Sequence, residues 1–531
     1  MDYSNRDRIN PRGRMDQPNR RKAALAFVLV AVAAVFLFRA WLEWHNVNDT
    51  KLATTDYVAF MAAAHQAESI ADPLQRCLHY PSLPGTHWND DTTVAYCQLS
   101  NYHTLALSEI DALLQQGKAA EVDRTFQSYL DTQLHDPKQP GMLDKAFYNA
   151  GFDNANTHTR AVIDSWKQQS PDSAFAFAAS GMQYVDAAQQ ARGTGWGRDL
   201  NEDQTKGMNQ QLILARQDLD HATTLQPAMP PVYTSMISAG GFAGDDDYMN
   251  QAAARGLAVD PANFAMRMQM VDKAQPKWGS EFGGEGEQQR EAKAQVSRNP
   301  LLRMIVGRTA VNRATCDCER TSNLIGQLMQ AADGNLSYGS LNDLAREAYN
   351  HNDPRLAVEL YSEALRFNPD DAEMLQWRAL QIAKLGDSSG AIESVAQAAR
   401  RFPDDNAIGT QFALAYVRAG KVKEAESTFL AVLKRDPDDQ IAMANLGDLY
   451  NHAAHQPDKA EAIADTLIRR HPDFAGGYIV RACNQMDHNL PGRYDTIHYF
   501  IDHFGDLDEF KSQAAEMRAY LIKHPEKLTT G

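Results

Sequence analysis

A short motif that recurs every 34 residues constrains the fold of this chain more than any other feature. A residue followed by Pro-Asp-Asp begins at Asn368, Phe402 and Asp436, and His471-Pro472-Asp473 follows after 35 residues. Repetition at a period of 20 to 50 residues is typical of solenoids, in which each unit buries its apolar face only against its neighbours. The sequence therefore predicts an array of similar units over this stretch.

The residues within each unit resemble the tetratricopeptide repeat. Ala425 and Phe429 match its Ala-x-x-x-Phe step, and Leu446, Gly447 and Tyr450 match its Leu-Gly-x-x-Tyr step. The resemblance covers residues 338–473 and implies four antiparallel helix pairs. It also implies that the chain binds other proteins. The predicted fold class is all-α, an α-solenoid of tetratricopeptide type preceded by an N-terminal transmembrane helix.

The residue types in the repeat have physical reasons for their places. A proline ends the preceding helix, and an Asp after it caps the next helix, so Pro-Asp-Asp is not read as a catalytic acidic pair. Gly386 and Gly420 are expected in turns that need a left-handed backbone. Small residues are expected where the two helices of a pair approach closely, namely Ala345, Ala379, Ala413 and Gly447.

The rest of the chain also has helical patterns without alternating, strand-like stretches. We expect a helical region at 45–160, a degenerate repeat-like helical domain at 161–335, and a helical cap at 474–531. One helix is predicted over 108–134. Pro227 and Pro261 again lie 34 residues apart.

Part of the middle region resembles a bacterial helical family of unknown function that often accompanies tetratricopeptide repeats. The resemblance supplies no activity. It rests on Trp166 before Ser170–Ser173, on Ala191–Gly193 and on Pro276–Gly279.

An apolar segment near the N-terminus predicts a membrane anchor. Residues 23–38 hold no charge and no helix breaker, and Trp41 and Trp44 follow Arg39 as an interfacial belt would. A helix over 23–44 is long enough to cross about 30 Å of hydrocarbon. The alternative is a cleaved signal peptide, although the following residues offer no small-residue cleavage site.

Charge asymmetry around this segment predicts its orientation. Seven basic residues precede it within residues 1–22, the expected cytoplasmic tail. The positive-inside rule then predicts a single-pass protein of a bacterial inner membrane with its C-terminal region in the periplasm. Residues 1–44 carry eight Lys or Arg and four Asp or Glu, so with −16 for the whole chain the residues from 45 on carry a formal charge of −20. Nucleic acid is therefore not an expected partner.

Cys77 and Cys97 bracket a segment rich in turn-forming residues. In an exported protein this arrangement favours a disulfide that pins a loop with little core of its own. A metal site formed with His79 and His87 is the alternative, but the spacing matches no standard zinc motif. No motif indicates a cofactor or a resident metal.

Helical periodicity places a set of polar side chains on the concave face formed by the first helix of each pair. Arg346, Lys384 and Arg418 are expected to contact an acidic or carboxylate-bearing segment of a protein of unknown identity. Arg346 and Trp377 occupy two places where chaperone-tail-binding relatives have a Lys and Asn clamp, so that ligand is not expected. The full candidate set is Asn342, Arg346, Asn350, Gln376, Lys384, Thr410, Arg418 and Asn451.

The predicted function is therefore that of a membrane-anchored scaffold or adaptor rather than an enzyme. Three alternatives stay open: an enzyme with an unrecognised site in the middle region, a structural protein that associates with itself, and a charged face without any dedicated ligand.

Overall fold

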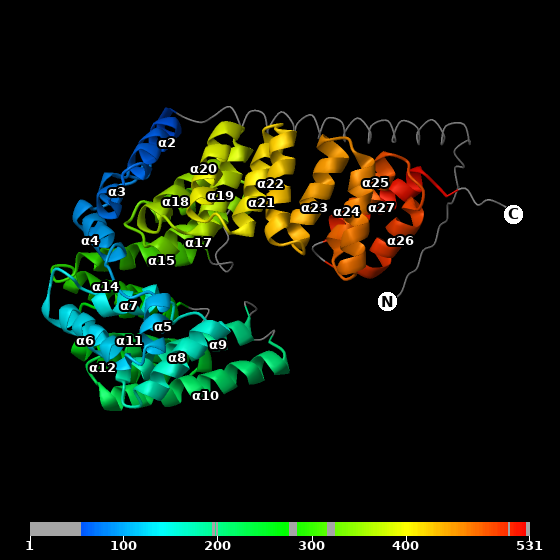
Figure 1. Ribbon diagram of the computed structural model, residues 1–531. Coiled ribbons are helices and arrows are strands. Elements are labelled where there is room, and N and C mark those ends of the chain that lie inside the picture. The colour runs from blue at the N-terminus through cyan, green and yellow to red at the C-terminus, as the bar shows by residue number, and fades with distance from the viewer. Residues whose placement is uncertain are drawn as a thin grey trace, which may run out of the picture. The chain divides into compact units, whose positions relative to one another are not determined.

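The computed structural model describes residues 55–193, 197, 200–275, 284–315, 324–507 and 510–526, and every regular element in these ranges is helical. Figure 1 shows their arrangement. The first part of the chain contains α2 (Thr55–Glu68), α3 (Pro73–His79), α4 (Asp90–Ser100), α5 (Leu107–Gln115), α6 (Ala119–His135), α7 (Met142–Asn149), α8 (Thr157–Gln169), α9 (Ala174–Arg192), α10 (Glu202–Leu225), α11 (Pro230–Ala243), α12 (Asp246–Val259), α13 (Phe264–Lys273), α14 (Glu285–Gln295), η3 (Pro300–Arg303), α15 (Met304–Ala314) and α16 (Leu324–Ala332).

The second part contains the predicted repeats and the helices that follow them. These elements are α17 (Tyr338–Asn350), α18 (Pro354–Phe367), α19 (Ala372–Lys384), α20 (Ser388–Arg401), α21 (Asn406–Arg418), α22 (Val422–Arg435), α23 (Gln440–Asp448), η5 (Leu449–Ala453), α24 (Pro457–Arg470), α25 (Ala475–Asp487), α26 (Arg493–Phe504) and α27 (Lys511–Lys523).

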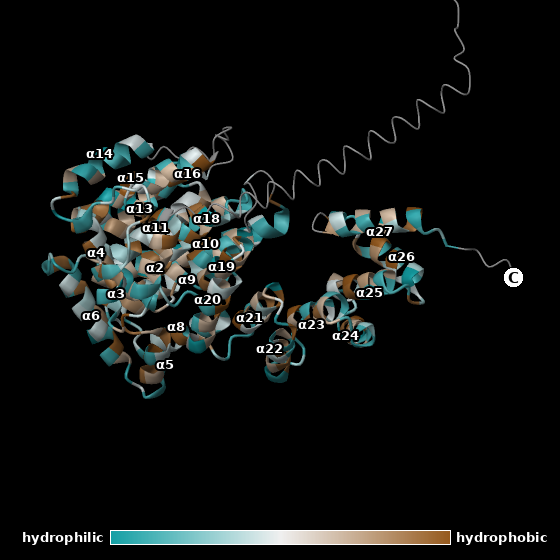
Figure 2. Cartoon of the chain, turned by 90° about the horizontal axis from the view of Figure 1, so that it is seen from above, coloured by the Kyte–Doolittle hydropathy of each residue, from teal (hydrophilic) through white to brown (hydrophobic). Residues whose placement is uncertain are grey.

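The solenoid part of the predicted fold class is confirmed, but the transmembrane part requires a correction. No helix in the described ranges is long and apolar enough to cross a membrane. The longest of them, the 24-residue α10, includes Glu202, Asp203 and Lys206, and charged side chains are costly in hydrocarbon. Figure 2 likewise shows teal and brown mixed along the helices that it labels. The predicted span at 23–44 lies outside the described residues. We therefore correct both the transmembrane anchor and the single-pass inner-membrane localisation.

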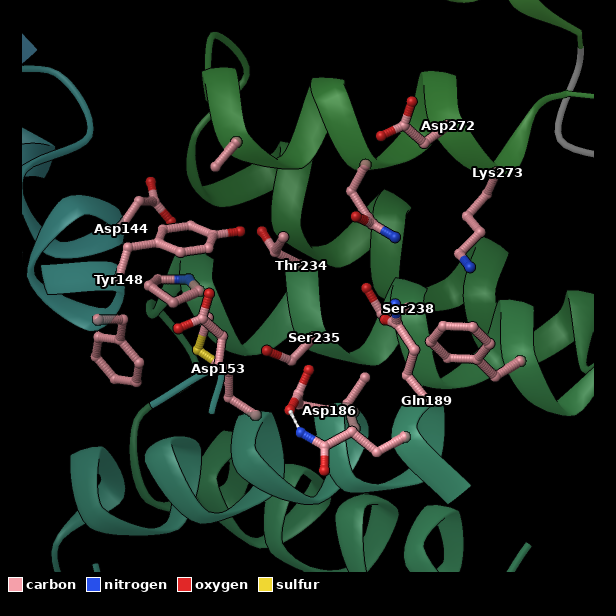
Figure 3. Close-up of a pocket in the computed structure, with 18 of the residues that line it drawn as sticks. Asp144, Tyr148, Asp153, Asp186, Gln189, Thr234, Ser235, Ser238, Asp272 and Lys273 are labelled. Atoms are coloured by element: carbon pink, nitrogen blue, oxygen red, sulfur yellow. Dashed lines mark hydrogen bonds between the residues drawn. The ribbon is translucent and has the colours of Figure 1, made fainter. Parts of the chain in front are cut away.

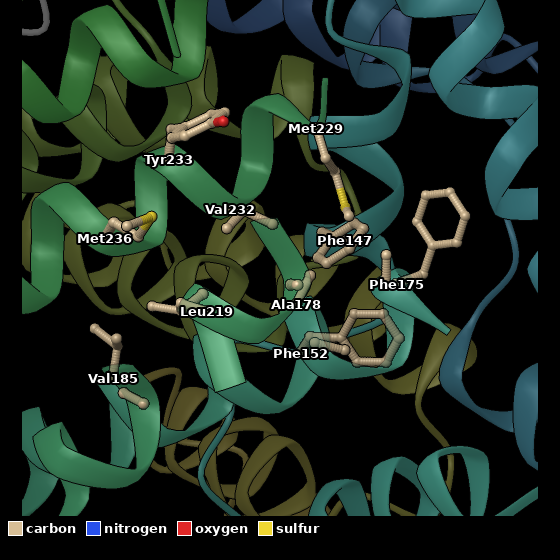
Figure 4. Packing of buried hydrophobic residues seen from close by; sticks show 14 of the residues in the cluster. Phe147, Phe152, Phe175, Ala178, Val185, Leu219, Met229, Val232, Tyr233 and Met236 are labelled. Carbon is tan, nitrogen blue, oxygen red and sulfur yellow. The ribbon is translucent and has the colours of Figure 1, made fainter. Parts of the chain in front are cut away.

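Helices α5 to α13 of the middle region share one hydrophobic core. Phe126 lies at its aromatic centre, with ring-centroid distances of 5.2 Å to Trp166, 5.6 Å to Phe147 and 6.0 Å to Phe175. Figure 4 shows Phe147 and Phe175 near residues of α9 and α11. Trp166, which the sequence singled out, is fully buried, and its Nε1 donates to Asp123 Oδ1 at 2.9 Å. Trp166 therefore has a packing role.

The repeats pack through the small residues that the sequence placed at the helix contacts. Ala345 and Ala413 are fully buried, and Ala379 is 4% exposed. A Cβ atom added to Gly447 would lie 2.7 Å from Val480 Cγ1, so a larger residue there would push the helices apart. Tyr361 and Phe429, at the aromatic positions of the motif, are fully buried as well.

Asp residues cap the first helices of the second, third and fourth pairs. The cap is the second Asp of each Pro-Asp-Asp motif: Asp371, Asp405 and Asp439 accept hydrogen bonds from the backbone of residues three positions later, at 2.8 to 2.9 Å. Gly386 and Gly420 adopt φ values of 82° and 69°, as the turns require. The motif therefore marks the helix boundaries in the way the sequence indicated.

The N-terminal helices α2 to α4 cover the outer side of the first repeats. Tyr57, Phe60 and Met61 of α2 form a buried cluster with Val358 of α18 and Ile382 of α19. Because of this cover, every residue of α18 from Leu356 to Phe367 is buried. The N-terminal helices are thus part of the packing of the repeat array.

Polar contacts hold these helices in place. Arg378 of α19 is buried, and its Nη1 lies 2.5 Å from Glu68 Oε1 of α2. A disulfide joins Cys77 of α3 to Cys97 of α4, with a Cα–Cα distance of 5.7 Å. Arg366 Nε donates to the Cys77 carbonyl at 2.8 Å, which connects α18 to this disulfide-linked pair.

Candidate functional site

The first helices of the repeats, α17, α19, α21 and α23, present the residues that the sequence predicted as contacts. α19 packs against α21, and α21 packs against α23, so these helices form neighbouring rows. We call the solvent-facing side of these helices the first-helix surface. Four of the predicted residues are exposed and two are half-buried; the exposed ones are Arg346, Asn350, Lys384 and Arg418, and the half-buried ones are Asn342 and Gln376.

Two predicted contact residues do not belong to this surface. Thr410 is 3% exposed, because it lies one helical turn before the buried Ala413 and shares its inward face. Asn451 is 2% exposed; its Nδ2 donates to Asp487 Oδ2 at 2.9 Å, and its Oδ1 lies 3.0 Å from His488 Nε2. Both side chains are buried inside the protein, so we correct their assignment as partner contacts.

A group of four side chains stands out on the first-helix surface. The ring centroids of Tyr349 on α17 and Trp377 on α19 are 5.0 Å apart. Lys384 Nζ lies 4.6 Å from the centre of the Tyr349 ring. Arg418 of α21 is close enough for its charge to lower the pKa of Lys384. We call Tyr349, Trp377, Lys384 and Arg418 the aromatic–basic cluster.

The two cations of this cluster have no carboxylate partner within the described ranges. Partial burial lowers the pKa of Lys384, and the charge of Arg418 lowers it further. Partial burial also lowers the pKa of Arg418. By contrast, Arg308, which is more deeply buried, pairs with Asp272 and Asp343. The cluster therefore leaves positive charge that an anion would compensate.

Arg346 lies beside the same cluster. The Tyr361 hydroxyl is buried without a hydrogen-bond partner. Burial raises the pKa of Tyr361. The charge of Arg346 lowers this pKa, whereas the charges of Glu373 and Tyr349 raise it. Glu373 Oε1 accepts from Trp377 Nε1 at 3.2 Å. The surface thus joins three basic side chains from three successive first helices.

Sequence reasoning identified the basic residues of the cluster but not Tyr349. Tyr349 lies three residues after Arg346, so the two share one face of α17, and this spacing was the available signal. The tilted contact between the Tyr349 and Trp377 rings depends on how two repeats dock, which the sequence of a single repeat does not reveal.

No metal site accompanies this surface. Across the residues that the structure describes, no three His, Cys, Asp or Glu side chains come together in a way that could hold a metal ion. His79 and His87 do not join the two cysteines, because Cys77 and Cys97 are linked to each other and His87 Nδ1 lies 2.8 Å from Asp333 Oδ1.

Comparison with known proteins identifies the repeats. The model of the tetratricopeptide-repeat family matches residues 342–406 and 410–475. No curated protein matches the chain.

Three solved structures share low sequence identity with the chain. A tetratricopeptide repeat protein from Parabacteroides merdae ATCC 43184 is 13% identical, with 54% of this chain and 99% of that chain covered and a TM-score of 0.34. Yeast Tom70 is 10% identical, with 81% and 96% covered and a TM-score of 0.33. MamA is 18% identical, with 36% and 97% covered and a TM-score of 0.25. These TM-scores are too low to support an inference about the fold or the function of this chain.

The motif, the paired helices and the match of the family model agree over the same stretch. Helical repeats of this type are scaffolds for interactions between proteins. Residues 342–475 of the chain therefore form tetratricopeptide repeats.

Proposed function

We propose that this protein binds an acidic or carboxylate-bearing segment of a protein partner at the aromatic–basic cluster. The observation that carries the proposal is the pair of Lys384 and Arg418, two partly desolvated cations without a carboxylate partner in the described ranges. A bound carboxylate would accept charge-assisted hydrogen bonds from both. Tyr349 and Trp377 would supply apolar contact area beside these charges.

The charge of the rest of the chain supports selectivity for such a partner. The protein as a whole is acidic, with a formal charge of −16. An acidic segment is therefore repelled by most of the molecule and attracted to the few places where positive charge is left uncompensated. Arg346, Lys384 and Arg418 form such a place on three consecutive first helices.

The test uses a fluorescein-labelled hexaglutamate peptide and the full chain, with fluorescence polarisation as the readout. Hexaglutamine serves as the uncharged control peptide. We expect saturable binding of hexaglutamate that weakens as salt is added, since exposed charges are screened. The triple variant Arg346→Ala, Lys384→Ala and Arg418→Ala should lose this binding, because each lost charge-assisted hydrogen bond costs about 1.5 to 3 kcal/mol.

A charge-matched variant separates a specific site from general electrostatics. Lys423→Ala, Lys434→Ala and Arg469→Ala remove the same number of charges from exposed positions on the second helices α22 and α24. This variant should bind hexaglutamate like the wild type. Each substitution of the test set is exposed and should change the free energy of unfolding by no more than about 0.5 kcal/mol. The proposal is contradicted if the triple variant at Arg346, Lys384 and Arg418 binds hexaglutamate like the wild type. It is also contradicted if the charge-matched control variant loses binding to the same extent as the triple variant.

A further inference from the structure

The middle region contains a cavity that the proposed partner site does not use. It has a volume of about 810 Å³ and is lined by residues of α7, α9, α11, α13 and α15 and of the segment after α7. Figure 3 shows ten of these residues by name. The volume lies in the range of about 300 to 1,000 Å³ that is typical of small-molecule sites.

Besides Asp144, which accepts hydrogen bonds from the neutral Gln133 and Asn263, two carboxyl groups in the cavity wall have no cationic partner in the part of the chain that is described. Asp186 of α9 accepts hydrogen bonds only from neutral groups, the Ala155 amide at 2.9 Å and Gln190 Nε2 at 3.0 Å. The protein packed around Asp153 raises the pKa of its carboxyl group, and the charge of Asp186 raises it further, although the Asp153 side chain itself is exposed to solvent. Burial also raises the pKa of Asp186. Neither carboxyl group thus forms an ion pair with a described residue.

The basic side chains of the cavity are engaged elsewhere. Arg308 Nε and Nη1 each lie 2.6 Å from a carboxylate oxygen, of Asp272 and Asp343 respectively. Lys273 Nζ lies 4.0 Å from the centre of the Phe242 ring. Arg192 Nη1 donates to the Gly193 carbonyl at 3.1 Å. None of these groups pairs with Asp153 or Asp186.

A buried hydroxyl supplies a second, independent indication of a ligand. Ser235 of α11 is 7% exposed, and its side chain makes no hydrogen bond to any described residue. Figure 3 shows it in the same part of the cavity as Asp153 and Asp186. Because Ser235 lines the cavity and its hydroxyl has no hydrogen-bond partner among the described residues, the hydroxyl is available to a polar group that enters the cavity.

We propose that this cavity binds a small organic cation with a primary ammonium group, held by Asp153, Asp186 and the Ser235 hydroxyl. The three donors of an ammonium group match these three acceptors. Tyr148 lines the same cavity, and its ring offers a face to the cation. A metal ion fits less well, because no three potential ligand side chains converge within the described residues.

Isothermal titration of the full chain with putrescine tests the proposal, and 1,4-butanediol is the uncharged control of equal length. We expect saturable binding of putrescine and none of the diol. Asp153→Asn should weaken the affinity about tenfold, because one charge-assisted contact is lost. Asp153 is exposed and makes no hydrogen bond to another side chain, so this variant should keep its fold.

Asp186→Asn should weaken binding to a similar extent, and circular dichroism shows whether its fold is kept. Asp247→Asn is the matched control, since Asp247 is an exposed carboxylate of the same region outside the cavity. The affinity should also fall at low pH as the two carboxyl groups become protonated. The proposal is overturned if the wild type shows no saturable binding, if the diol binds equally, or if Asp153→Asn binds putrescine as tightly as Asp247→Asn does.

Discussion

The most strongly perturbed carboxyl group in the middle region is that of Asp144. It is 5% exposed, and its Oδ2 accepts hydrogen bonds from Asn263 Nδ2 and Gln133 Nε2, both at 2.7 Å. Burial raises its pKa to about 7; the two hydrogen bonds oppose this effect, and the charge of Asp260 adds to it. The folded protein therefore favours the protonated form far more than the unfolded chain does.

This shift predicts a pH dependence of stability. Because folding raises the pKa of Asp144, the protonated carboxyl group stabilises the folded protein. This stabilisation is fully present below the pKa of Asp144 in the unfolded chain and is lost as the pH rises through about 7. Between about pH 8 and about pH 6 the free energy of unfolding should increase by about 1 kcal/mol from this group. Urea titrations at both values of pH measure this change.

The variant Asp144→Asn should remove that share of the pH dependence. Glu359 provides an internal comparison, because burial also raises its pKa to about 7 and its contribution remains in the variant. Glu359→Gln should remove the other share. An identical pH dependence in the wild type and in Asp144→Asn would show that Asp144 does not titrate in this range.

At the scale of the helices, close packing within the repeats decides stability. Ala425 of α22 is fully buried at the first apolar position of the motif, whereas Leu430 on the same helix is 48% exposed. Ala425→Leu should lower the free energy of unfolding by roughly 1 to 3 kcal/mol, because it overpacks a helix junction. Leu430→Ala should change it by less than about 0.5 kcal/mol. Chemical denaturation of both variants checks the contrast, and equal effects would refute it.

The disulfide between α3 and α4 is expected to stabilise the protein. Cys77 and Cys97 are fully buried and 20 residues apart in sequence. Replacing both by Ser should lower the free energy of unfolding by roughly 3 kcal/mol in the chain-entropy model. Peptide mapping without reduction should recover the two peptides linked. Recovery of two separately alkylated cysteines from the native protein would contradict the assignment.

The helix boundaries of the repeats could be predicted because proline, glycine and Asp act locally. Gly386, Gly420 and the capping Asp residues all occupy the expected turns. The fourth repeat is one residue longer than the 34-residue period, and the structure accommodates the extra residue in the π-helical turn η5. This turn shifts the helical register, so Asn451 faces inward and not toward solvent. A fixed period cannot reveal such a shift.

Non-local packing explains what else could not be predicted. The single helix expected over 108–134 is interrupted at Gly117, where φ is 69° and α5 turns back into α6. The cover of α18 by α2 joins residues about 300 positions apart, as in the contact of Ser362 Oγ with Met61 Sδ. The cavity acids Asp153 and Asp186 also come together only through tertiary folding. None of these contacts leaves a local sequence signal.

At the scale of the whole chain, two large cores contain most of the buried apolar residues. One core joins α5 to α13 and contains Leu219, and the other joins α3, α4 and the first repeats and contains Leu344. Both leucines are fully buried. Separate cores of this size can unfold in separate steps.

Calorimetry of the full chain should therefore resolve more than one unfolding transition. Leu219→Ala and Leu344→Ala each create a cavity that costs about 2 to 5 kcal/mol. Each substitution should lower the Tm of a different transition by several degrees. A single transition that both variants shift equally would show that the two cores unfold together.

Photo-cross-linking shows directly whether a partner binds at the aromatic–basic cluster. A hexaglutamate peptide that carries a benzophenone is irradiated with the full chain, and the modified residues are mapped by mass spectrometry. We expect cross-links on α17, α19 and α21 near Tyr349 and Trp377, and we expect these cross-links to be lost in the double variant Lys384→Ala and Arg418→Ala. Cross-links concentrated on the second helices α18, α20 and α22, or unchanged in that variant, would contradict the proposal.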